Sequence, residues 1–403
     1  MERFKMHDQD PHISADLPSL PLLDVTVPPF NAVSDTTIGA GSLAELAFRN
    51  AGPAAVGFLD WIIEQSRQDG IDHILFVGDA GHILQTLMQG RRLNSPGAAL
   101  PPSSHLPASH VLFMLSNMDS TNVLGIDESR FFIHLPAFLD RSNGLSTAEL
   151  LERSGIPIPS DAVMKDLGLD REQRLPLSDA TRLTDFLLAW RWEILKVCRR
   201  NRRGLFRYMH RLGLGGGQRL ALVGIDWHGA TQNAFEQALR DFMPLNVMGY
   251  HFALADSQES RERRNTLRMK AFLDADTIGS GLMQAIAANH VAIEFLFCTE
   301  QKPVIGFSED SKDYIIDPGR ADTRLLSAQR AEIGLGIRQF ASQTRHQCGQ
   351  SSVAMAMPLL HFVADGRWAN HPHLAQVKNF DAWITSSNCD RRLADYAVKP
   401  QPY

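Results

Sequence analysis

The sequence predicts an α/β fold built around a parallel β-sheet, with helical insertions and a helical C-terminal region. Two stretches carry this prediction, one beginning at Ile74 and the other at Leu220. Each consists of a short, continuously apolar run, a glycine-containing turn and an amphipathic helix. Strands that are apolar on both faces are typical of parallel sheets covered by helices. We therefore expect the two turns to meet at the C-terminal edge of one sheet, where ligands of open α/β sheets bind.

Length, charge and cysteine content narrow the class of protein. A chain of 403 residues is long enough for one large domain with insertions or for two domains. The net charge of −5 argues against a protein that coats nucleic acid. Cysteines 198, 298, 348 and 389 are far apart and form no C-x-x-C pair, which indicates reduced thiols rather than a disulfide framework or a zinc site. With no apolar run of about 18 residues, we expect a cytoplasmic protein without a transmembrane segment.

The first third of the chain predicts an arm, a helix and the first strand–turn–helix unit. Residues 1–40 are polar and punctuated by prolines, so we expect an extended arm. A helical pattern runs over 42–69. The strand Ile74–Val77 follows, and then a turn before a helix that starts near Ile83. That turn consists of Gly78, Asp79, Ala80, Gly81 and His82.

The next segments predict a loop, a strand and a helical insertion. Residues 94–110 are rich in proline, serine and glycine and predict a loop. Val111–Leu115 predicts a third strand, which ends in Ser116 and Asn117. From 145 to 211 the pattern is mainly helical, and we expect a helical insertion over about 140–211.

The segment 190–211 holds seven arginines, one lysine and four aromatic residues. Such a basic face suits a phosphorylated or lipid-linked acceptor, or peripheral contact with an anionic membrane surface. The alternative is a solvated helix whose charge offsets acidic neighbours. Sequence-specific recognition of nucleic acid is not expected, because no known nucleic-acid-binding pattern accompanies the arginines.

The second strand–turn–helix unit is the most informative stretch. Leu220–Val223 predicts a buried strand, Gly224–Thr231 a sharp turn, and a helix begins near Gln232. A helix start leaves backbone N–H groups unpaired and carries partial positive charge, so the unit suits an anion such as phosphate. The alternative is an ordinary strand-to-helix connection, since the spacing matches neither a P-loop nor a dinucleotide fingerprint.

The last part of the chain adds a strand and then helices. Val247–Leu254 predicts a fourth strand, and the highly charged stretch 257–270 reads as solvated. Glu294 lies within the apolar run VAIEFLF, so its carboxylate must be paired, protonated or functional. From residue 320 onward the pattern is helical. We expect one α/β domain over 41–340 and a helical extension over 341–403.

Several segments, in order, resemble one family. They resemble the carboxy-terminal region of large bacterial polysaccharide-biosynthesis proteins that often carry a haloacid-dehalogenase-type phosphatase. That region resembles a glycan phosphoribosyltransferase, which moves 5-phosphoribose from phosphoribosyl pyrophosphate (PRPP) onto a glycan before the phosphatase removes the 5-phosphate. No Asp-x-Asp-x-Thr segment is present, so the phosphatase would be a separate partner. The matching segments are GPAAVGFLDWI (52–62), ILFVGDAGHIL (74–84), RGLFRYMHRLGL (203–214), LALVGIDWHGATQ (220–232), GYHFAL (249–254) and EFLF (294–297).

The resemblance implies a Rossmann-like core of the type I phosphoribosyltransferase kind and assigns roles around PRPP and Mg²⁺. Asp226 would hold the ribose hydroxyls, directly or through the metal, and the turn after it would hold the 5-phosphate. Asp79 would be the base that deprotonates the acceptor, with His82 and then His228 as the next candidates. The implied phosphate-binding residues are Trp227, His228, Gly229, Ala230, Thr231 and Gln232; the implied pyrophosphate loop is Gly78, Asp79, Ala80, Gly81 and His82; further pocket candidates are Ser116, Asn117 and Glu294.

The sequence also departs from the family at charged positions. The family tends to carry Arg-Asp-Gly after its first strand, where this chain has Asp79, Ala80 and Gly81. Ser-Arg after the third strand is replaced by Ser116 and Asn117. Losing an arginine near a pyrophosphate removes a bidentate contact. Two other functions therefore stay open: a non-catalytic relative that binds a partner in polysaccharide assembly, and a glycosyltransferase that uses a nucleotide sugar.

Overall fold

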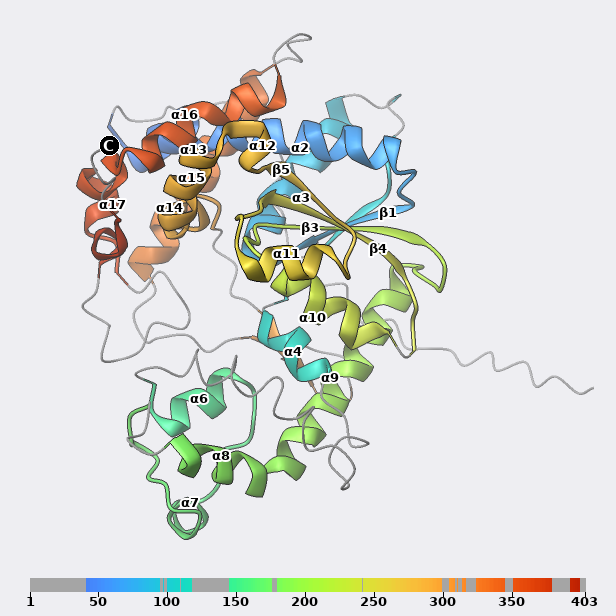
Figure 1. Ribbon diagram of the computed structural model, residues 1–403, viewed down its shortest axis with the longest axis vertical. Helices are drawn as coiled ribbons and strands as arrows, with labels where there is room; N and C mark the ends of the chain where they lie inside the picture. Colours follow the sequence, from blue (N-terminus) through green and yellow to red (C-terminus); the bar gives the residue numbers. More distant parts are fainter. Residues whose placement is uncertain are drawn as a thin grey trace, which may run out of the picture.

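A computed structural model gives the fold of the chain, and most of the region after residue 40 is described (Figure 1). The described residues are 41–94, 97, 100–108, 110–117, 145–175, 180–240, 242–298, 304–308, 310, 314–316, 324–344, 351–378 and 392–398. The predicted arm over 1–40 lies outside them. In chain order the main elements are α1 (Leu43–Arg49), α2 (Ala51–Gln68), β1 (His73–Val77), α3 (Gly78–Asn94), β2 (Ser103–Leu106), α4 (His110–Asn117), α6 (Thr147–Arg153), α7 (Asp161–Asp166), α8 (Ala180–Ala189), α9 (Arg191–Arg211), β3 (Arg219–Gly224), α10 (Ala230–Leu239), β4 (Asn246–Ala253), α11 (Gln258–Arg264), β5 (Met269–Leu273), α12 (Ala275–Ile278), α13 (Ser280–Ala288), α14 (His290–Leu296), β6 (Val304–Phe307), β7 (Tyr314–Ile316), α15 (Arg324–Gln343), α16 (Ser352–Ala364) and α17 (Pro372–Ala375).

The centre of the molecule is a five-stranded sheet in which all neighbouring strands are parallel. Its order is β2-β1-β3-β4-β5, with Ile74 of β1 opposite Ala221 of β3. This order is one of the common arrangements of doubly wound α/β folds. The predicted α/β fold with a Rossmann-like parallel core is therefore confirmed. The direction of winding reverses between β1 and β3, so the two strand–turn–helix units flank the switch point of the sheet.

Alternate residues of the central strands enter two different hydrophobic clusters, because side chains along a strand point to opposite faces. On one face Ile74 and Phe76 pack with α2, α3 and helices from the C-terminal third of the chain. On the other face Leu75 and Val77 pack with α4, α9 and α10. Strand β1 is buried along its whole length. These three layers are helices, sheet and helices, which explains the continuously apolar strands of the sequence.

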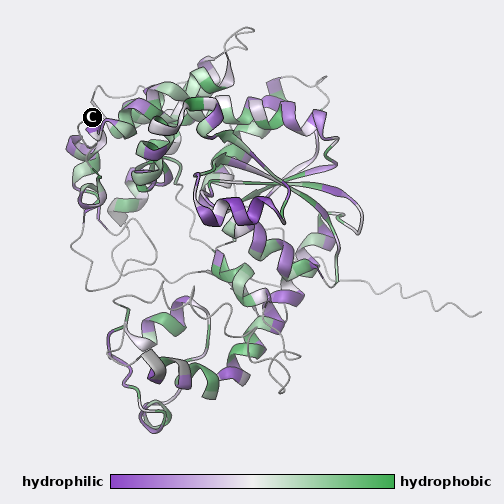
Figure 2. Cartoon of the chain, in the orientation of Figure 1, coloured by the Kyte–Doolittle hydropathy of each residue, from purple (hydrophilic) through white to green (hydrophobic). Residues whose placement is uncertain are grey.

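The helices after β7 belong to the main core. Helix α15 packs against α1 and α2, and α16 packs against α2. Buried residues of this region, such as Leu359 and Trp368, lie in the same hydrophobic cluster as β1. Helices α6–α8 instead share a separate cluster with α4 and the first half of α9. They form the lower part of the molecule in Figure 1, and Figure 2 shows hydrophilic and hydrophobic residues alternating along α9.

Two predictions of secondary structure before residue 120 are wrong. The expected strand Val111–Leu115 lies inside helix α4, where it packs against both α9 and α10. The edge strand of the sheet is β2, which lies within the stretch 94–110 that was expected to be a loop. Short apolar runs fit a buried strand and a buried helix equally well, and tertiary packing decided between them.

The structure also differs from the sequence prediction at two helix starts and in the charged stretch 257–270. The predicted turn Gly78–His82 is the first turn of α3, which follows β1 directly. Helix α10 begins at Ala230, two residues earlier than expected. The charged stretch 257–270 contains helix α11 and the start of β5, the strand at the other edge of the sheet. The strand predictions for β1, β3 and β4 and the helical predictions for 42–69 and for the described parts of 145–211 are confirmed.

A search of the helices in the described part of the chain finds none that has both the length and the apolar character needed to span a bilayer.

Candidate functional site

Two strand-to-helix junctions meet at the C-terminal edge of the sheet, one after β1 and one after β3. The strands are hydrogen-bonded neighbours, and Phe76 lies opposite Val223 close to the ends of both. In open α/β sheets this edge, at the switch point, is where ligands bind. The two junctions therefore form the candidate site, and they are described in turn.

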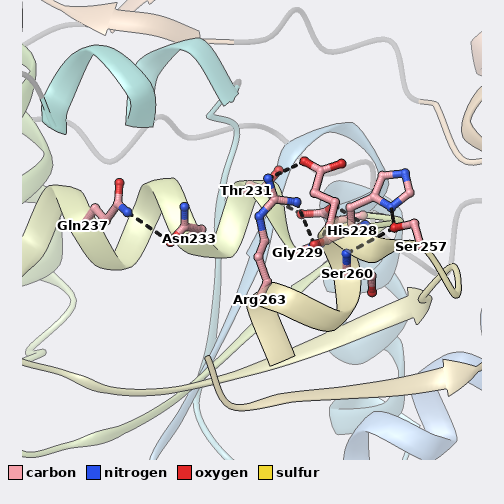
Figure 3. Close-up of polar contacts among 10 residues, drawn as sticks. His228, Gly229, Thr231, Asn233, Gln237, Ser257, Ser260 and Arg263 are labelled. Atoms are coloured by element: carbon pink, nitrogen blue, oxygen red, sulfur yellow. Dashed lines mark hydrogen bonds and ion pairs between the residues drawn. The ribbon is translucent and has the colours of Figure 1, made fainter. Parts of the chain in front are cut away.

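The loop between β3 and α10 is closed around the carboxylate of Asp226. Its Oδ1 accepts hydrogen bonds from the backbone N–H groups of His228 and Gly229, both at 3.0 Å. Its Oδ2 accepts from the N–H of Thr231 at 2.8 Å. Three backbone N–H groups of the loop thus surround an anion, and that anion is a side chain of the loop itself; we call this arrangement the anion cradle, and binding of a phosphate here stays a prediction. Figure 3 shows His228, Gly229 and Thr231 gathered at the start of α10.

These contacts set the charge of Asp226. Burial alone would raise the pKa of the carboxyl group, but nearby His251 and His110 and the hydrogen bonds from His228 and Thr231 favour the ionised form. The net effect lowers its pKa below the ordinary value. Asp226 is therefore an anion at neutral pH.

Gly229 makes this turn possible. It has a φ of 75°, in the left-handed region, at the position just before α10. A Cβ at this position would lie 2.4 Å from Sδ of Met269 on β5. The left-handed backbone angle favours glycine here, and a Cβ would in addition force the flexible Met269 side chain to shift. The glycine that the sequence places in the turn is thus explained mainly by its backbone conformation.

Helix α11 holds the outer side of the loop. Nδ1 of His228 lies 3.0 Å from Oγ of Ser257, the N-cap residue of α11. Arg263 donates from Nη1 to the carbonyl oxygen of His228 at 2.9 Å. Figure 3 shows the Arg263 side chain extending toward Gly229 and Thr231. A guanidinium group therefore lies beside the loop, and it comes from the charged stretch that the sequence suggested was merely solvated.

Gln232 faces the sheet and not the cradle. It is fully buried and accepts a hydrogen bond at 3.0 Å from Nε2 of His251 on β4. Its amide nitrogen donates to Glu236 and to the carbonyl oxygen of Arg268. This places its side chain in a buried polar network under α10. Burial also lowers the pKa of His251, against the raising effect of Asp226, so its imidazole is neutral at neutral pH.

Trp227 and Glu294 come together, although they are far apart in the sequence. The indole Nε1 of Trp227 donates to Oε1 of Glu294 at 3.2 Å. The Trp227 side chain is otherwise buried in the core. Glu294 is exposed on α14, so its apolar neighbours in sequence point inward while its carboxylate points out. The expectation that this carboxylate must be paired, protonated or functional assumed that it is buried, whereas it is exposed and accepts a hydrogen bond from Trp227, which ties the loop to α14.

The junction between β1 and α3 has a different character. Nε2 of His105, on β2, donates to the carbonyl oxygen of Gly78 at 2.8 Å. The rings of His82 and His105 lie 5.5 Å apart, centroid to centroid. A Cβ on Gly81 would lie 2.8 Å from the carbonyl carbon of Phe76, so glycine allows α3 to start close against β1. Within the described residues, neither buried ring nitrogen of His82 has a hydrogen-bond partner.

Burial shifts the titration of three side chains at this junction. It raises the pKa of Asp79 to about 6, although Arg330 of α15 works in the opposite direction. It lowers the pKa of His82 to about 4, and Arg338 adds to that shift. The pKa of His105 is also lowered to about 4 by burial, against the effect of its bond to Gly78. The pKa of Asp79 thus lies near neutral pH, whereas the pKa values of both imidazoles lie well below it.

Ser116 and Asn117 lie apart from these junctions. The Ser116 hydroxyl donates to the carbonyl oxygen of Leu112 within α4, and its backbone carbonyl accepts from Arg202 of α9. The Asn117 amide donates to Gln237, six residues beyond Thr231 on α10. Figure 3 shows Gln237 well along α10 from His228. The two residues connect α4 with α9 and α10, because their segment is a helix beside the sheet and not a strand within it.

The residues present do not make a ready metal site. No cluster of three or more histidine, cysteine or acidic side chains that could hold a metal ion occurs in the described part of the chain. Both oxygens of Asp226 are already engaged by backbone N–H groups.

Sequence reasoning missed several residues that surround the two junctions. They come from distant segments: His105 from the unpredicted strand β2, His110 from α4, His251 from β4, Ser257 and Arg263 from α11, and Arg330 and Arg338 from α15. The signal that could have found His251 is its place within an apolar strand, where a polar residue needs a partner. No local pattern marks the others.

Comparison with known proteins adds no family to this picture: no model of a known protein family matches the sequence, and no curated protein matches it significantly.

Proposed function

We propose that the chain is a glycan phosphoribosyltransferase, which transfers a 5-phosphoribosyl group from PRPP to a glycan hydroxyl. The observation that supports this best is the pairing of two junctions at the switch point of the sheet, one an anion cradle and the other a junction that carries Asp79. PRPP carries an anionic group at each end of its ribose. A site with two separate strand-to-helix junctions suits such a donor.

In this proposal the cradle exchanges one anion for another. The N–H groups of His228, Gly229 and Thr231, which now bind Asp226, would bind the 5-phosphate of the donor. The freed carboxylate of Asp226 would then accept hydrogen bonds from the ribose hydroxyls. This exchange keeps the three donors satisfied in both states, which matters because an unsatisfied buried donor is costly.

The transfer itself breaks the bond from C1 of the ribose to the pyrophosphate oxygen and forms a bond from C1 to the acceptor oxygen. The pyrophosphate leaves with the electron pair, and the acceptor proton must go to a base. Asp79 suits this role, because a pKa raised to about 6 makes a carboxylate a better base near neutral pH. Mg²⁺ would arrive with the donor and neutralise charge on the leaving group.

A second function is favoured by one specific observation. The cradle donors are already satisfied by Asp226, so the loop is complete without a ligand. A relative that has lost catalysis and serves as a binding partner in polysaccharide assembly would keep this internal contact permanently. No comparable observation favours a nucleotide-sugar donor.

A titration with PRPP separates the two functions. The purified chain is titrated with PRPP, with and without Mg²⁺, as wild type, as Asp226→Asn and as Thr231→Val, which removes a hydroxyl at the start of α10 that would also donate to the 5-phosphate. The transferase proposal predicts micromolar, Mg²⁺-dependent binding that each variant weakens by about tenfold or more, the effect of one lost charge-assisted hydrogen bond. Asp161→Asn, which removes an exposed carboxylate on α7, is the matched control. Folded wild-type protein that does not bind millimolar PRPP would contradict the transferase and favour the binding partner.

A further inference from the structure

The basic residues of helix α9 fall into two groups, one half-buried and one exposed. Arg200, Arg202 and Arg207 are half-buried and donate to backbone carbonyls of Gly155, Ser116 and Asp310, respectively. These three arginines fasten α9 to its neighbours and explain part of the charge as structural. The exposed residues of the helix are arranged differently.

Six exposed residues form a single line along α9. They follow one another at intervals of four and three residues, which keeps them on one face of a helix with 3.6 residues per turn. At 1.5 Å per residue the line is roughly 27 Å long. We call it the α9 stripe; its members are Trp192, Lys196, Arg199, Arg203, Phe206 and His210.

The α9 stripe combines cations with exposed aromatic rings. Trp192 is 46% exposed and Phe206 is 37% exposed, and these are two of the five large hydrophobic side chains that are exposed in the described part of the chain. Lys196, Arg199 and Arg203 lie between the two rings. Lys196 also contacts Glu193, with Nζ and Oε1 2.6 Å apart, at the edge of the stripe. The opposite face of the helix is apolar and buried against α4 and β6.

From this pattern we propose that the α9 stripe docks the protein on an anionic lipid bilayer. Lys196, Arg199 and Arg203 attract anionic headgroups, and the exposed rings of Trp192 and Phe206 on either side of these cations can enter the boundary between headgroups and acyl chains. A partner helix would require apolar residues at this four–three spacing, where α9 has cations. A soluble anion would satisfy the cations but would not cover the exposed parts of the Trp192 and Phe206 rings.

Such docking would connect the bilayer to the candidate site through side chains. Arg202 of α9 donates to the carbonyl of Ser116 at the end of α4, and Asn117 donates to Gln237 of α10. Helix α10 begins at the anion cradle. Helix α9, which carries the stripe on another face, is therefore joined by two hydrogen bonds through the end of α4 to the helix that carries Thr231. This suits a reaction on a lipid-linked glycan.

Vesicle flotation with the full chain tests the proposal. One vesicle type contains phosphatidylcholine alone, and the other mixes phosphatidylcholine and phosphatidylglycerol at about three to one. We expect the protein to float only with the anionic vesicles, and to be released as salt is raised, because salt screens exposed charges. Equal binding to both vesicle types, or to neither, would overturn the proposal.

Two double variants and a matched control locate the surface. Arg199→Gln with Arg203→Gln should weaken binding to anionic vesicles by roughly tenfold or more, since each basic residue near the surface contributes about fivefold. Trp192→Ala with Phe206→Ala should weaken it as well. Arg49→Gln with Arg67→Gln removes the same charge from exposed positions on α1 and α2 and should have little effect. All substituted side chains are exposed, so thermal unfolding should confirm that each variant is folded.

Three results would contradict docking through the α9 stripe. The control variant could lose as much binding as the arginine variant, which would show that vesicle binding depends on the net charge of the protein and not on the α9 stripe. The aromatic variant could bind as well as wild type, which would indicate a purely electrostatic contact. Glycerol phosphate could release the protein from the vesicles, which would indicate a soluble anion. Because this assay uses no PRPP, its outcome is independent of the proposed transferase activity.

Discussion

The two strand-to-helix junctions at the switch point lie on neighbouring strands but satisfy their polar groups differently. After β3, the Asp226 carboxylate engages three backbone N–H groups, and its pKa is lowered. After β1, burial raises the pKa of Asp79 to about 6, and within the described residues both ring nitrogens of His82 lack hydrogen-bond partners. The ionised carboxylate of Asp226 therefore stabilises the folded state at the first junction, whereas ionising Asp79 at the second junction destabilises it. Unsatisfied groups of the second kind are typical of functional sites.

The largest expected effect tests the internal anion after β3. Asp226→Ala leaves the N–H groups of His228, Gly229 and Thr231 without their acceptor, so we expect the free energy of unfolding at pH 7 to fall by about 1.5–3 kcal/mol. The folded pKa of Asp226 is lowered, so its contribution is complete above the unfolded pKa and is lost as the pH falls through the folded pKa. Chemical denaturation of wild type and variant measures both effects. An unchanged unfolding free energy would show that the loop does not depend on the carboxylate.

A somewhat smaller effect tests the packing after β1. Alanine normally stabilises a helix relative to glycine, but Gly81→Ala would place a Cβ 2.8 Å from the backbone of Phe76. We expect a destabilisation of about 1–3 kcal/mol, as for other overpacked sites. Gly97→Ala serves as a control, since a Cβ there meets nothing within 4 Å. A stabilised Gly81→Ala protein would mean that α3 does not start so close to β1.

The charge of Asp79 should appear in the pH dependence of stability. Its folded pKa is raised from 3.8 to about 6, so the folded chain keeps a proton that the unfolded chain has already lost. Wild-type stability should therefore fall as the pH rises through this interval, by about 1–3 kcal/mol in total. Asp79→Asn should remove that dependence and be the more stable protein above pH 6. If the unfolding free energies of wild type and Asp79→Asn changed in parallel with pH, the raised pKa of Asp79 would be contradicted.

The smallest expected effect concerns the outer support of the cradle. Ser257 caps α11 and contacts His228, so Ser257→Ala should destabilise the protein by about 0.5–2 kcal/mol. Ser160→Ala removes a serine cap from α7, far from the site, and is the matched control for stability. Only the Ser257 variant should also change the amide NMR signals of His228 and Gly229. If the His228 and Gly229 amide signals were the same in both variants, α11 would not support the cradle.

The comparison also shows how far the sequence could predict the site. The apolar runs of β1, β3 and β4 and the glycine at 229 follow from local patterns, so the sheet and the turn after β3 were predictable. That Asp226 fills the cradle was not, because a loop acid can face a ligand or its own backbone with the same sequence. The segment at Val111 could not be assigned because a short apolar run fits a buried helix as well as a strand.

Residues brought in from a distance account for the other errors. His105 lies on an edge strand of only four residues inside a proline-rich stretch, and Arg330 comes from a helix 250 residues after Asp79. Neither has a local signal, because long-range packing alone sets their position. Ser116 and Asn117 were placed at the sheet edge only because their segment was taken for a strand.

The difference between the two junctions can be measured in one sample by following the carboxyl carbon signals of Asp226 and Asp79 with NMR as the pH is varied. The structure predicts that Asp226 titrates below the ordinary aspartate pKa of 3.8 and that Asp79 titrates near 6. It also predicts that the amide signals of His228, Gly229 and Thr231 move with Asp226. Equal titration of the two carboxyl groups at the ordinary value, with those amides unaffected, would contradict a cradle closed on its own carboxylate.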